Sequence, residues 1–469
     1  MSQMAISEEQ LEKLPREELV VLVKLLLKEI EQLKARIAEL EAQSSSRPPP
    51  ATSRNSSQPS SRDQKPNSGE QRSRKRVGAA PGHEKATRPW VENPDRVIEA
   101  KVDKCANCQR ELHGLPPDRI VRHQIEELPI VRPLVIETQI HEVECPHCHT
   151  PQRGELPEGL EPTRQFGPRL EATVVYYKQE QHLSYERIVE TMRDLCGVEL
   201  SQGGINCILR RAGGAAQPQA DQIAEQVAES AIIGSDETSA RVKARNWWQW
   251  VFRSDAGIVH RIEPTRGAEV VEKFMGDNCA QCWVSDCYGA QLKAPAQRRQ
   301  LCIAHQLRAL QRLIEQDSQL RWPGAMQGLF QEAIHLWNRF TSGSEMTILG
   351  YLRRVTEIEN DLDELLAQDL TETIARTLHA RFVKHRESLL TFLRYPGVPP
   401  DNNACERALR PSVIHRKVTN GFRSEWAAKA YAALETVIET GKLQGRRTFQ
   451  ILVEIMGKPV LHFLDTSNS

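Results

Sequence analysis

Three acidic residues in the second half of the chain have the residue types and surroundings of a metal site. Asp236 and Asp286 each follow a short apolar run typical of a buried strand, Ile232-Ile-Gly-Ser-Asp236 and Gln281-Cys-Trp-Val-Ser-Asp286. Glu406 lies in Asp401-Asn-Asn-Ala-Cys-Glu406, a segment typical of a helix start. Two strand-end carboxylates and one helical carboxylate suit two divalent cations, which sit about 3.5–4 Å apart and clamp the attacking and leaving oxygens of a phosphodiester. We therefore expect the fold to bring Glu406 to Asp236 and Asp286.

The segment around Glu406 allows a second interpretation. Residues 401–412 predict a short helix, because Asn402 or Asn403 can cap its start and Pro411 can stop it. Asn403-x-x-Glu406 also fits a capping box, in which the glutamate only accepts a backbone N–H. We expect Glu406 to face the two aspartates instead. Glu237 is the alternative to its neighbour Asp236 as a metal ligand, but the Glu237 side chain should point to the opposite face of the strand.

Two cysteine pairs predict a structural zinc site in a module spanning residues 96–160. Pairs with this spacing can grip one tetrahedral Zn²⁺, and four protein ligands leave no open position for catalysis. A redox role for the pairs is the weaker alternative, and His147 or His149 could replace one ligand. The four predicted ligands are Cys105, Cys108, Cys145 and Cys148.

A second zinc site is a weaker possibility. Cys279-x-x-Cys282 and Cys302-x-x-His305 have ligand spacing. Cys282 lies inside a predicted strand, however, where a buried thiol packs as a small hydrophobic group.

Composition bounds the class of protein. A length of 469 residues suggests about three domains. Lys and Arg balance Asp and Glu at 62 each, so any contact with nucleic acid must come from local patches. Eleven cysteines, an odd number without a signal-peptide pattern, favour a reducing compartment and therefore the cytoplasm. The most apolar run near the start, 19–27, is too short to span a bilayer, so we expect no membrane contact.

The first two segments predict a dimer and a tether. Residues 8–42 carry a heptad with leucine at d and β-branched residues at most a positions, which favours a parallel coiled-coil homodimer. The alternative is one amphipathic helix docked on its own chain. Residues 43–95 are basic and poor in apolar residues, which predicts a disordered linker that could also grip phosphates.

Residues 161–222 predict a helix-turn-helix-like DNA-binding region. One amphipathic helix ends at Gly197, and Ser201 caps the next, which we expect to run to about Ala212. Its basic end, Arg210 and Arg211, is the candidate DNA contact. Many helix pairs bind nothing, so a purely structural pair is the alternative.

The remaining chain predicts an α/β core interrupted by helices. Residues 230–305 give the order strand, strand, strand, helix, strand, which is that of an RNase H-like domain, and 398–423 should return to complete it. Residues 306–397 read as an all-α insertion between Asp286 and Glu406. Residues 424–469 predict a C-terminal helical region. The expected fold is therefore a multidomain α/β protein.

These features together resemble the transposases of the IS66 family of bacterial insertion sequences. The resemblance covers nearly the whole chain, although Cys287 stands where a glycine is common and the glycine-rich part of the linker is reduced. The matching motifs are Phe166-Gly-Pro-Arg-Leu170, Leu183-Ser-Tyr-Glu-Arg187, Ser235-Asp-Glu-Thr238, Arg266-Gly-Ala-Glu269, Val284-Ser-Asp-Cys-Tyr288, Cys302-Ile-Ala-His305 and Asp401-Asn-Asn-Ala-Cys-Glu-Arg-Ala-Leu-Arg-Pro411 with Arg416-Lys417.

The resemblance implies a DDE transposase that nicks the ends of an insertion sequence and joins them to target DNA. Asp236, Asp286 and Glu406 would hold Mg²⁺ or Mn²⁺, with Asp236 shared by both ions. The implied partners are terminal inverted repeats, target DNA and possible accessory proteins of the same element, in the cytoplasm at the bacterial nucleoid. The implied DNA contacts are His305, Arg407, Arg410, Arg416 and Lys417, with a core or capping role as the alternative for His305.

Two other functions fit parts of the same sequence. A catalytically inert DNA-binding regulator would keep the zipper, zinc module and helix pair. The presence of all three acids disfavours it. A recombination nuclease would cut without joining.

Overall fold

The computed structural model describes residues 24, 27–35, 51–52, 54–56, 88–155, 164–343 and 346–457. The predicted zipper (8–42) and linker (43–95) lie for the most part outside these residues. Residues 27–35 are helical, with Leu27, Ile30 and Leu33 exposed. No helix within the described ranges is long and apolar enough to cross a membrane.

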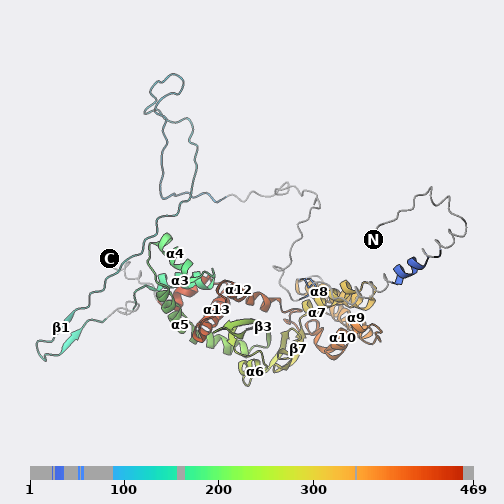
Figure 1. Cartoon of the computed structure of the whole chain (residues 1–469). Coiled ribbons are helices and arrows are strands. Elements are labelled where there is room, and N and C mark those ends of the chain that lie inside the picture. The colour runs from blue at the N-terminus through green and yellow to red at the C-terminus, as the bar shows by residue number, and fades with distance from the viewer. Residues whose placement is uncertain are drawn as a thin grey trace.

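The body of the molecule is a five-stranded mixed sheet between two groups of helices (Figure 1). The strands stand in the order β5-β4-β3-β6-β7. β3 pairs antiparallel with β4, as β4 does with β5, whereas β3–β6 and β6–β7 are parallel. The strands are β3 (Ile232–Val242), β4 (Arg245–Arg253), β5 (Ile258–Glu263), β6 (Ala280–Ser285) and β7 (Ala296–Leu301), with α6 (Glu269–Met275) before β6 and the 3-10 turn η2 (Gln291–Lys293) before β7.

The two faces of this sheet bury different side chains, because successive strand residues point to opposite sides. One face carries the aromatic core, in which Phe252 of β4 stacks on Phe274 of α6 with ring centroids 3.9 Å apart. On the other face Val251 packs against Cys405 and Leu409 of helix α12 (Asn403–Thr419). Helix α12 therefore covers the second face of the sheet.

Helix α13 (Glu425–Leu443) covers the outer edge of β5, the strand at one end of the sheet. The backbone N–H of Ile258 donates to Thr440 Oγ1 at 3.0 Å, and that of His260 donates to Thr436 Oγ1 at 2.9 Å. An open edge strand would leave these donors unpaired or free to pair with another chain. The predicted C-terminal region thus packs as part of the body, where α14 (Thr448–Met456) joins α3 (Pro168–Gln179).

The expected helix pair is present, but its second helix is longer than predicted. Helix α4 (Tyr185–Cys196) ends at Gly197, whose φ of 64° suits glycine, and the Ser201 hydroxyl accepts the Gly204 N–H at 3.0 Å. Helix α5 runs over Gln202–Ala228 and does not end near Ala212. The buried alanines 212, 216, 220 and 224 continue one apolar stripe, which packs α5 closely on α13.

The segment between β7 and α12 forms a helical unit with its own core. Phe330 and Phe382 meet edge to face there, with ring centroids 5.6 Å apart. Cys282, Val284 and Leu301 from the sheet join the same core. The elements are α7 (Ile303–Gln316), α8 (Arg321–Thr341), α9 (Ile348–Leu366), α10 (Thr373–Lys384), η3 (Arg386–Ser388) and α11 (Thr391–Arg394).

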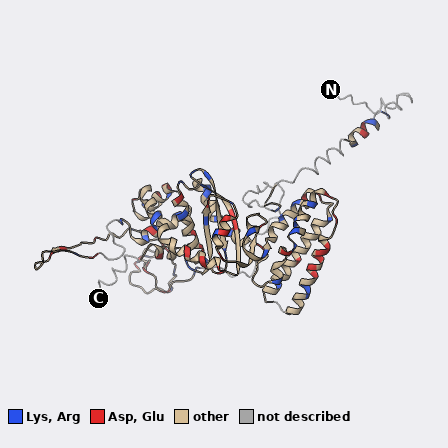
Figure 2. Ribbon diagram, turned by 90° about the horizontal axis from the view of Figure 1, so that it is seen from below, with Lys and Arg blue, Asp and Glu red and all other residues tan. Residues whose placement is uncertain are grey.

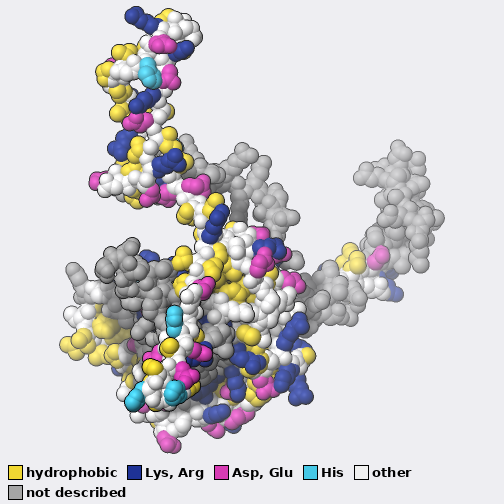
Figure 3. Space-filling view, turned by 90° about the vertical axis from the view of Figure 1, so that its left-hand side faces the viewer, with side chains coloured by type: hydrophobic (Ala, Val, Ile, Leu, Met, Phe, Trp, Pro, Cys, Tyr) yellow, Lys and Arg dark blue, Asp and Glu magenta, His cyan; other side chains and the backbone are white. Residues whose placement is uncertain are grey.

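The segment 88–155 extends away from the body (Figures 1 and 3). It contains one short hairpin, β1 (Glu142–Glu144) with β2 (Pro151–Arg153), and exposes apolar side chains such as Ile98, Leu128 and Val135. Along the ribbon of the body, basic and acidic residues are intermixed (Figure 2), in keeping with the balanced composition.

Candidate active site

Asp236 and Asp286 lie side by side at the point where β3 and β6 part. The parallel register pairs Gly234 with Val284. Continued by two residues beyond the last ladder pair, this register sets Asp236 level with Asp286, whose charge contributes to the raised pKa of Asp236. Asp286 directly follows β6, as predicted.

The prediction that Asp236 ends a strand is wrong. Asp236 lies inside β3, because β3 stays paired with β4 as far as Val242 after its pairing with β6 stops at Gly234. Asp236 is thus held on one side by an antiparallel ladder, while its other side faces the end of β6.

A chain of hydrogen bonds fixes the start of α12 to both strand ends. Asn402, which is 2% exposed, donates its Nδ2 to the Ser235 carbonyl at 2.7 Å and its backbone N–H to Cys302 Sγ at 3.2 Å. The Cys302 N–H in turn donates to the Ser285 carbonyl at 2.8 Å. Ser235 and Ser285 are the residues just before the two aspartates. These bonds therefore fix the position of the loop before α12 relative to both aspartates.

Gly234 permits this close approach of α12 to β3. A Cβ atom at this position would lie 2.9 Å from Cys405 Sγ and 3.2 Å from Asn402 Oδ1. Because the first contact is shorter than real Cβ contacts, any larger residue would push the helix start away from the sheet.

Glu406 projects from the first turn of α12 toward helix α7. Its Oε1 lies 3.1 Å from Arg308 Nη2 and 3.7 Å from His305 Nε2. The N-cap residue of α12 is Asn402, and it makes no side-chain capping bond. The capping-box alternative for Asn403 and Glu406 is therefore not formed, and the Glu406 carboxylate is available for other contacts.

The electrostatics of Asp236 reflect its acidic neighbours. Burial, and then the charges of Glu237, Asp286 and Glu406, raise the pKa of Asp236 well above its usual value. Backbone donors oppose this only in part, since Asp236 Oδ1 accepts the Glu237 N–H at 2.9 Å. Within the described residues, Asp236, Asp286 and Glu406 do not form a group whose ligand atoms all lie within 4.8 Å of one another, so joint binding of a metal by the three acids stays a prediction.

The side chain of Glu237 points away from this group, as predicted. It is 2% exposed and accepts hydrogen bonds from Arg266 and Gln291. Glu237 is therefore bound to its own neighbours and is not free to replace Asp236.

Helix α12 does not stop at Pro411, contrary to the prediction. It continues to Thr419 and ends at Asn420, whose φ is 59°. The missing proline N–H costs one helical bond, but Ser412 and His415 beyond it are buried, and the His415 ring packs at a tilt against that of Tyr431 with centroids 4.6 Å apart. Packing of this buried face outweighs the local cost. Residues 415–417 consequently lie in the helix.

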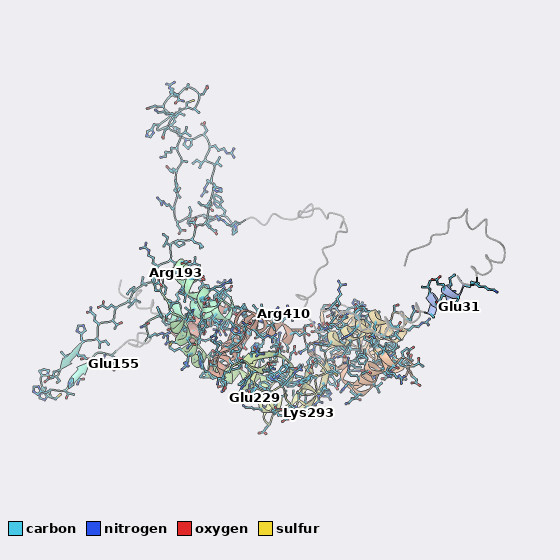
Figure 4. All side chains as sticks on the ribbon, viewed as in Figure 1. Glu31, Glu155, Arg193, Glu229, Lys293 and Arg410 are labelled. Atoms are coloured by element: carbon cyan, nitrogen blue, oxygen red, sulfur yellow. The ribbon has the colours of Figure 1, made fainter. Side chains whose placement is uncertain are left out.

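The predicted DNA contacts on α12 fall into two groups. Arg407, Arg410 and Lys417 are exposed, and within the described residues none of them forms a hydrogen bond or an ion pair. Their spacing of 3 and 7 residues puts them along one outer stripe of the helix, on which Figure 4 labels Arg410. Arg416 instead donates to the carbonyl and hydroxyl of Ser239 on β3.

Arg210 and Arg211 hold α5 to its neighbours. The Arg210 guanidinium lies over the Trp426 ring at 4.6 Å from the centroid. Arg211 pairs with Glu171, a buried carboxylate that Arg164 also contacts at 2.7 Å. Both predicted DNA-binding arginines are thus engaged within the protein, although both remain exposed.

His305 lies in a cluster that joins the predicted Cys302-x-x-His305 pair to Glu406, a member that the sequence did not indicate. Ligand atoms of Cys302, His305 and Glu406 all lie within 4.8 Å of one another. Burial raises the pKa of the Cys302 thiol to about 12, and Arg308 already offsets the Glu406 charge. Without a bound metal this thiol is protonated, and His305 and Arg308 both lie against the Glu406 carboxylate. Within the described residues, Cys279 and Cys282 do not join the cluster.

The main residue missed by sequence reasoning is Arg308. It lies three residues after His305 on α7, so both side chains share one face of the helix. That spacing was visible in the sequence. The partner, Glu406, lies 98 residues further along the chain, so the contact was not visible.

The two cysteine pairs adopt the same hairpin geometry. Cys105 N–H donates to the Arg110 carbonyl at 2.9 Å, and Cys145 N–H donates to the Thr150 carbonyl at 3.0 Å. The residue directly after the second cysteine of each pair, Gln109 or His149, has a φ between 50° and 60°. Each turn thus presents its two thiols in the same way.

Hydrogen bonds also favour a thiolate in each pair. Donors from Cys108 and Asn107 lower the pKa of Cys105, and Thr150 lowers that of Cys148. Within the described residues the two pairs are not gathered into one group of metal ligands. The single zinc site therefore stays a prediction.

The part of the chain that contains the five-stranded sheet matches a known protein family. A family model described as "Transposase IS66 family" matches residues 163–430, which is more than half of the chain and includes all three acids. The chain belongs to this family.

Two relatives come from Sinorhizobium fredii, and both are described as uncharacterized proteins. The chain is 25% identical to y4qI over 285 residues, which cover 53% of this chain and 51% of that protein. It is 25% identical to y4hP over 399 residues, which cover 76% of this chain and 71% of that protein. The aligned part thus spans only about half the length of y4qI.

Proposed function

We propose that this protein is a DDE transposase that cuts DNA at the ends of an insertion sequence and joins the ends to target DNA. Asp236, Asp286 and Glu406 hold two Mg²⁺ or Mn²⁺ ions. The observation that carries the proposal is the register of β3 and β6, which aligns the two aspartates under the helix that bears Glu406. Membership of the IS66 family supports it.

The strand order supports an RNase H-like core. Three antiparallel strands are followed by a helix and two strands that run parallel to the first. The first strand, β3, is central, so Asp236 is held by β4 on one side and faces the end of β6 on the other. The strand ends in such a sheet are where a ligand site is expected.

The chemistry proceeds in two displacements at phosphorus. In the first, a water oxygen bonds to phosphorus at the element end, the P–O3′ bond breaks and a 3′-OH is released. In the second, this 3′-OH oxygen bonds to a target phosphorus while a target P–O3′ bond breaks, so the number of phosphodiester bonds is conserved. When bound, the two ions activate the attacking oxygen and neutralise charge at the leaving oxygen.

The side chains of the protein position the DNA for these steps. Asp236 would help to hold both ions, and Asp286 and Glu406 would each help to hold one. Arg407, Arg410 and Lys417 on the outer stripe of α12 contact backbone phosphates, which fix the register of the DNA without reading its sequence.

The zinc module and zipper serve assembly in this proposal. The cysteine pairs close one structural zinc site, and residues 8–42 join two copies of the chain. The protein acts at the bacterial nucleoid, with accessory proteins of the same element as possible partners.

The test is incubation of the purified protein with the terminal inverted repeats that flank its gene, with Mg²⁺ or Mn²⁺. Joined products that vanish in Asp236→Asn support the transposase. Asp255→Asn is the matched control, because Asp255 is an exposed acid in the β4–β5 turn. Cleavage without joining would instead indicate a nuclease, and binding alone would indicate an inert regulator.

A further inference from the structure

Arg266 occupies a position that the proposed chemistry leaves unexplained. It belongs to the motif Arg266-Gly-Ala-Glu269, between β5 and α6. Its guanidinium lies between two rings, 4.6 Å from the centroid of Trp248 and 3.8 Å from that of Tyr288. This planar cation stacks on both aromatic faces, as arginine does in tightly held sites.

Arg266 also grips Glu237 with two donors. Its Nε and Nη2 donate to Glu237 Oε1 at 3.0 and 2.6 Å. Glu237 Oε2 accepts from Gln291 Nε2 at 2.7 Å. The Glu237 side chain is 2% exposed, so Arg266 supplies the charge that keeps this carboxylate inside the fold.

Two of the residues that Arg266 contacts, Glu237 and Tyr288, also donate to the two aspartates. The Glu237 N–H donates to Asp236 Oδ1 at 2.9 Å. The Tyr288 N–H donates to Asp286 Oδ1, also at 2.9 Å. In addition, the Tyr288 hydroxyl donates to the Arg266 carbonyl at 3.2 Å. Each backbone donor to an aspartate therefore belongs to a residue held by Arg266.

This contact lies where the backbone no longer links the two strands. The β3–β6 pairing ends at Gly234 and Val284, two residues before the aspartates. Beyond that point no ladder bond sets the distance between Asp236 and Asp286. The side chains on the opposite face of the sheet bridge this gap.

We propose that Arg266 is a positioning residue, which locks Asp236 and Asp286 to each other through Glu237 and Tyr288. This inference rests on the proposed function, because it assigns Arg266 to the same metal site. It also gives the Arg266-Gly-Ala-Glu269 motif a role that needs no contact with DNA or metal.

The test measures Mn²⁺ binding to the full chain by electron paramagnetic resonance of the free ion. Arg266→Lys keeps the positive charge but removes the planar guanidinium, which supplies both the two N–H donors to Glu237 and the flat surface that stacks on the rings. Loss of a residue that orients metal ligands typically weakens affinity about 10- to 100-fold. We therefore expect the Mn²⁺ dissociation constant to rise at least about tenfold, with DNA cleavage largely recovered at saturating Mn²⁺.

The matched control is Arg261→Lys. Arg261 lies over the Phe274 ring at 5.3 Å, so it also loses an aromatic contact, but it has no link to either aspartate. We expect its Mn²⁺ affinity to equal that of the wild type. If Arg266→Lys does not fold, Tyr288→Leu removes one stacking ring and should raise the dissociation constant in the same direction.

The outcomes separate this inference from the proposed function. If the wild type binds no Mn²⁺, or if Asp236→Asn binds it equally well, the proposed metal site itself is wrong. If Asp236→Asn loses binding but Arg266→Lys keeps wild-type affinity, only the role of Arg266 is overturned. A lower melting temperature with unchanged affinity overturns it as well, because it indicates a purely structural role.

Discussion

Replacing Asn402 by alanine removes the side chain that ties helix α12 to strand β3. Asn402 is 2% exposed, and its Nδ2 donates to the buried Ser235 carbonyl at 2.7 Å. Leaving a buried polar group without its partner costs about 1–3 kcal/mol. We expect the free energy of unfolding of Asn402→Ala to fall by about this amount.

The effect on activity should exceed the effect on stability. Asn402 sits one turn before Glu406, so its loss lets the start of α12 move relative to the two aspartates. A displacement of about 1 Å in a catalytic site can reduce the rate about 100-fold. Urea denaturation and a DNA-cleavage assay on the same variant measure the two quantities separately.

Asn403→Ala is the matched control for this prediction. The Asn403 side chain makes no hydrogen bond within the described residues, and only its backbone N–H is bonded, to Asp401 Oδ1 at 3.0 Å. If Asn403 were a capping residue, its loss would cost about 1 kcal/mol. We expect almost no change. A loss of stability in Asn403→Ala as large as that in Asn402→Ala would refute the assigned roles.

Four further predictions concern the proposed metal sites. Arg308→Gln removes the cation beside Glu406, and since a partly exposed pair is worth up to about 1 kcal/mol, Mn²⁺ should bind up to about fivefold more tightly. Weaker Mn²⁺ binding in this variant would contradict a competing role for Arg308. Because burial and neighbouring carboxylates raise the pKa of Asp236, a proton competes with the metal, so Mn²⁺ affinity should rise with pH, and Asp236→Asn should reduce this slope. Without metal, the stability contributed by Asp236 is full below the ordinary value of 3.8 and is lost as pH rises through the raised pKa, which thermal unfolding at several pH values measures. Elemental analysis should find one zinc per chain, lost in Cys145→Ser, and two zinc ions per wild-type chain would contradict a single shared site.

Local patterns predicted the features that depend on neighbouring residues. Gly197 and Ser201 mark helix ends because capping involves residues within one turn. The position of Asp286 after β6 followed from a short apolar run, and the opposite orientation of Glu237 followed from strand alternation.

Features that depend on distant partners were not visible in the sequence. The length of β3 around Asp236 is set by its ladder with β4, not by the apolar run before it. The passage of α12 through Pro411 depends on packing against α13 and β3. The contact of Arg266 with Glu237 joins residues 29 positions apart on one face of the sheet. Helix and strand periodicity relate only residues that are close in the sequence, so they could not predict this contact.

The most direct test of the metal site is a crystal structure of the protein with Mn²⁺ and a DNA end, recorded at the manganese absorption edge. We expect two anomalous peaks from manganese about 3.5–4 Å apart. Both should contact Asp236, one should also contact Asp286, and the other should contact Glu406 after its release from Arg308. Absence of manganese at Asp236 and Asp286, with Glu406 still paired to Arg308, would contradict the assignment of these three acids.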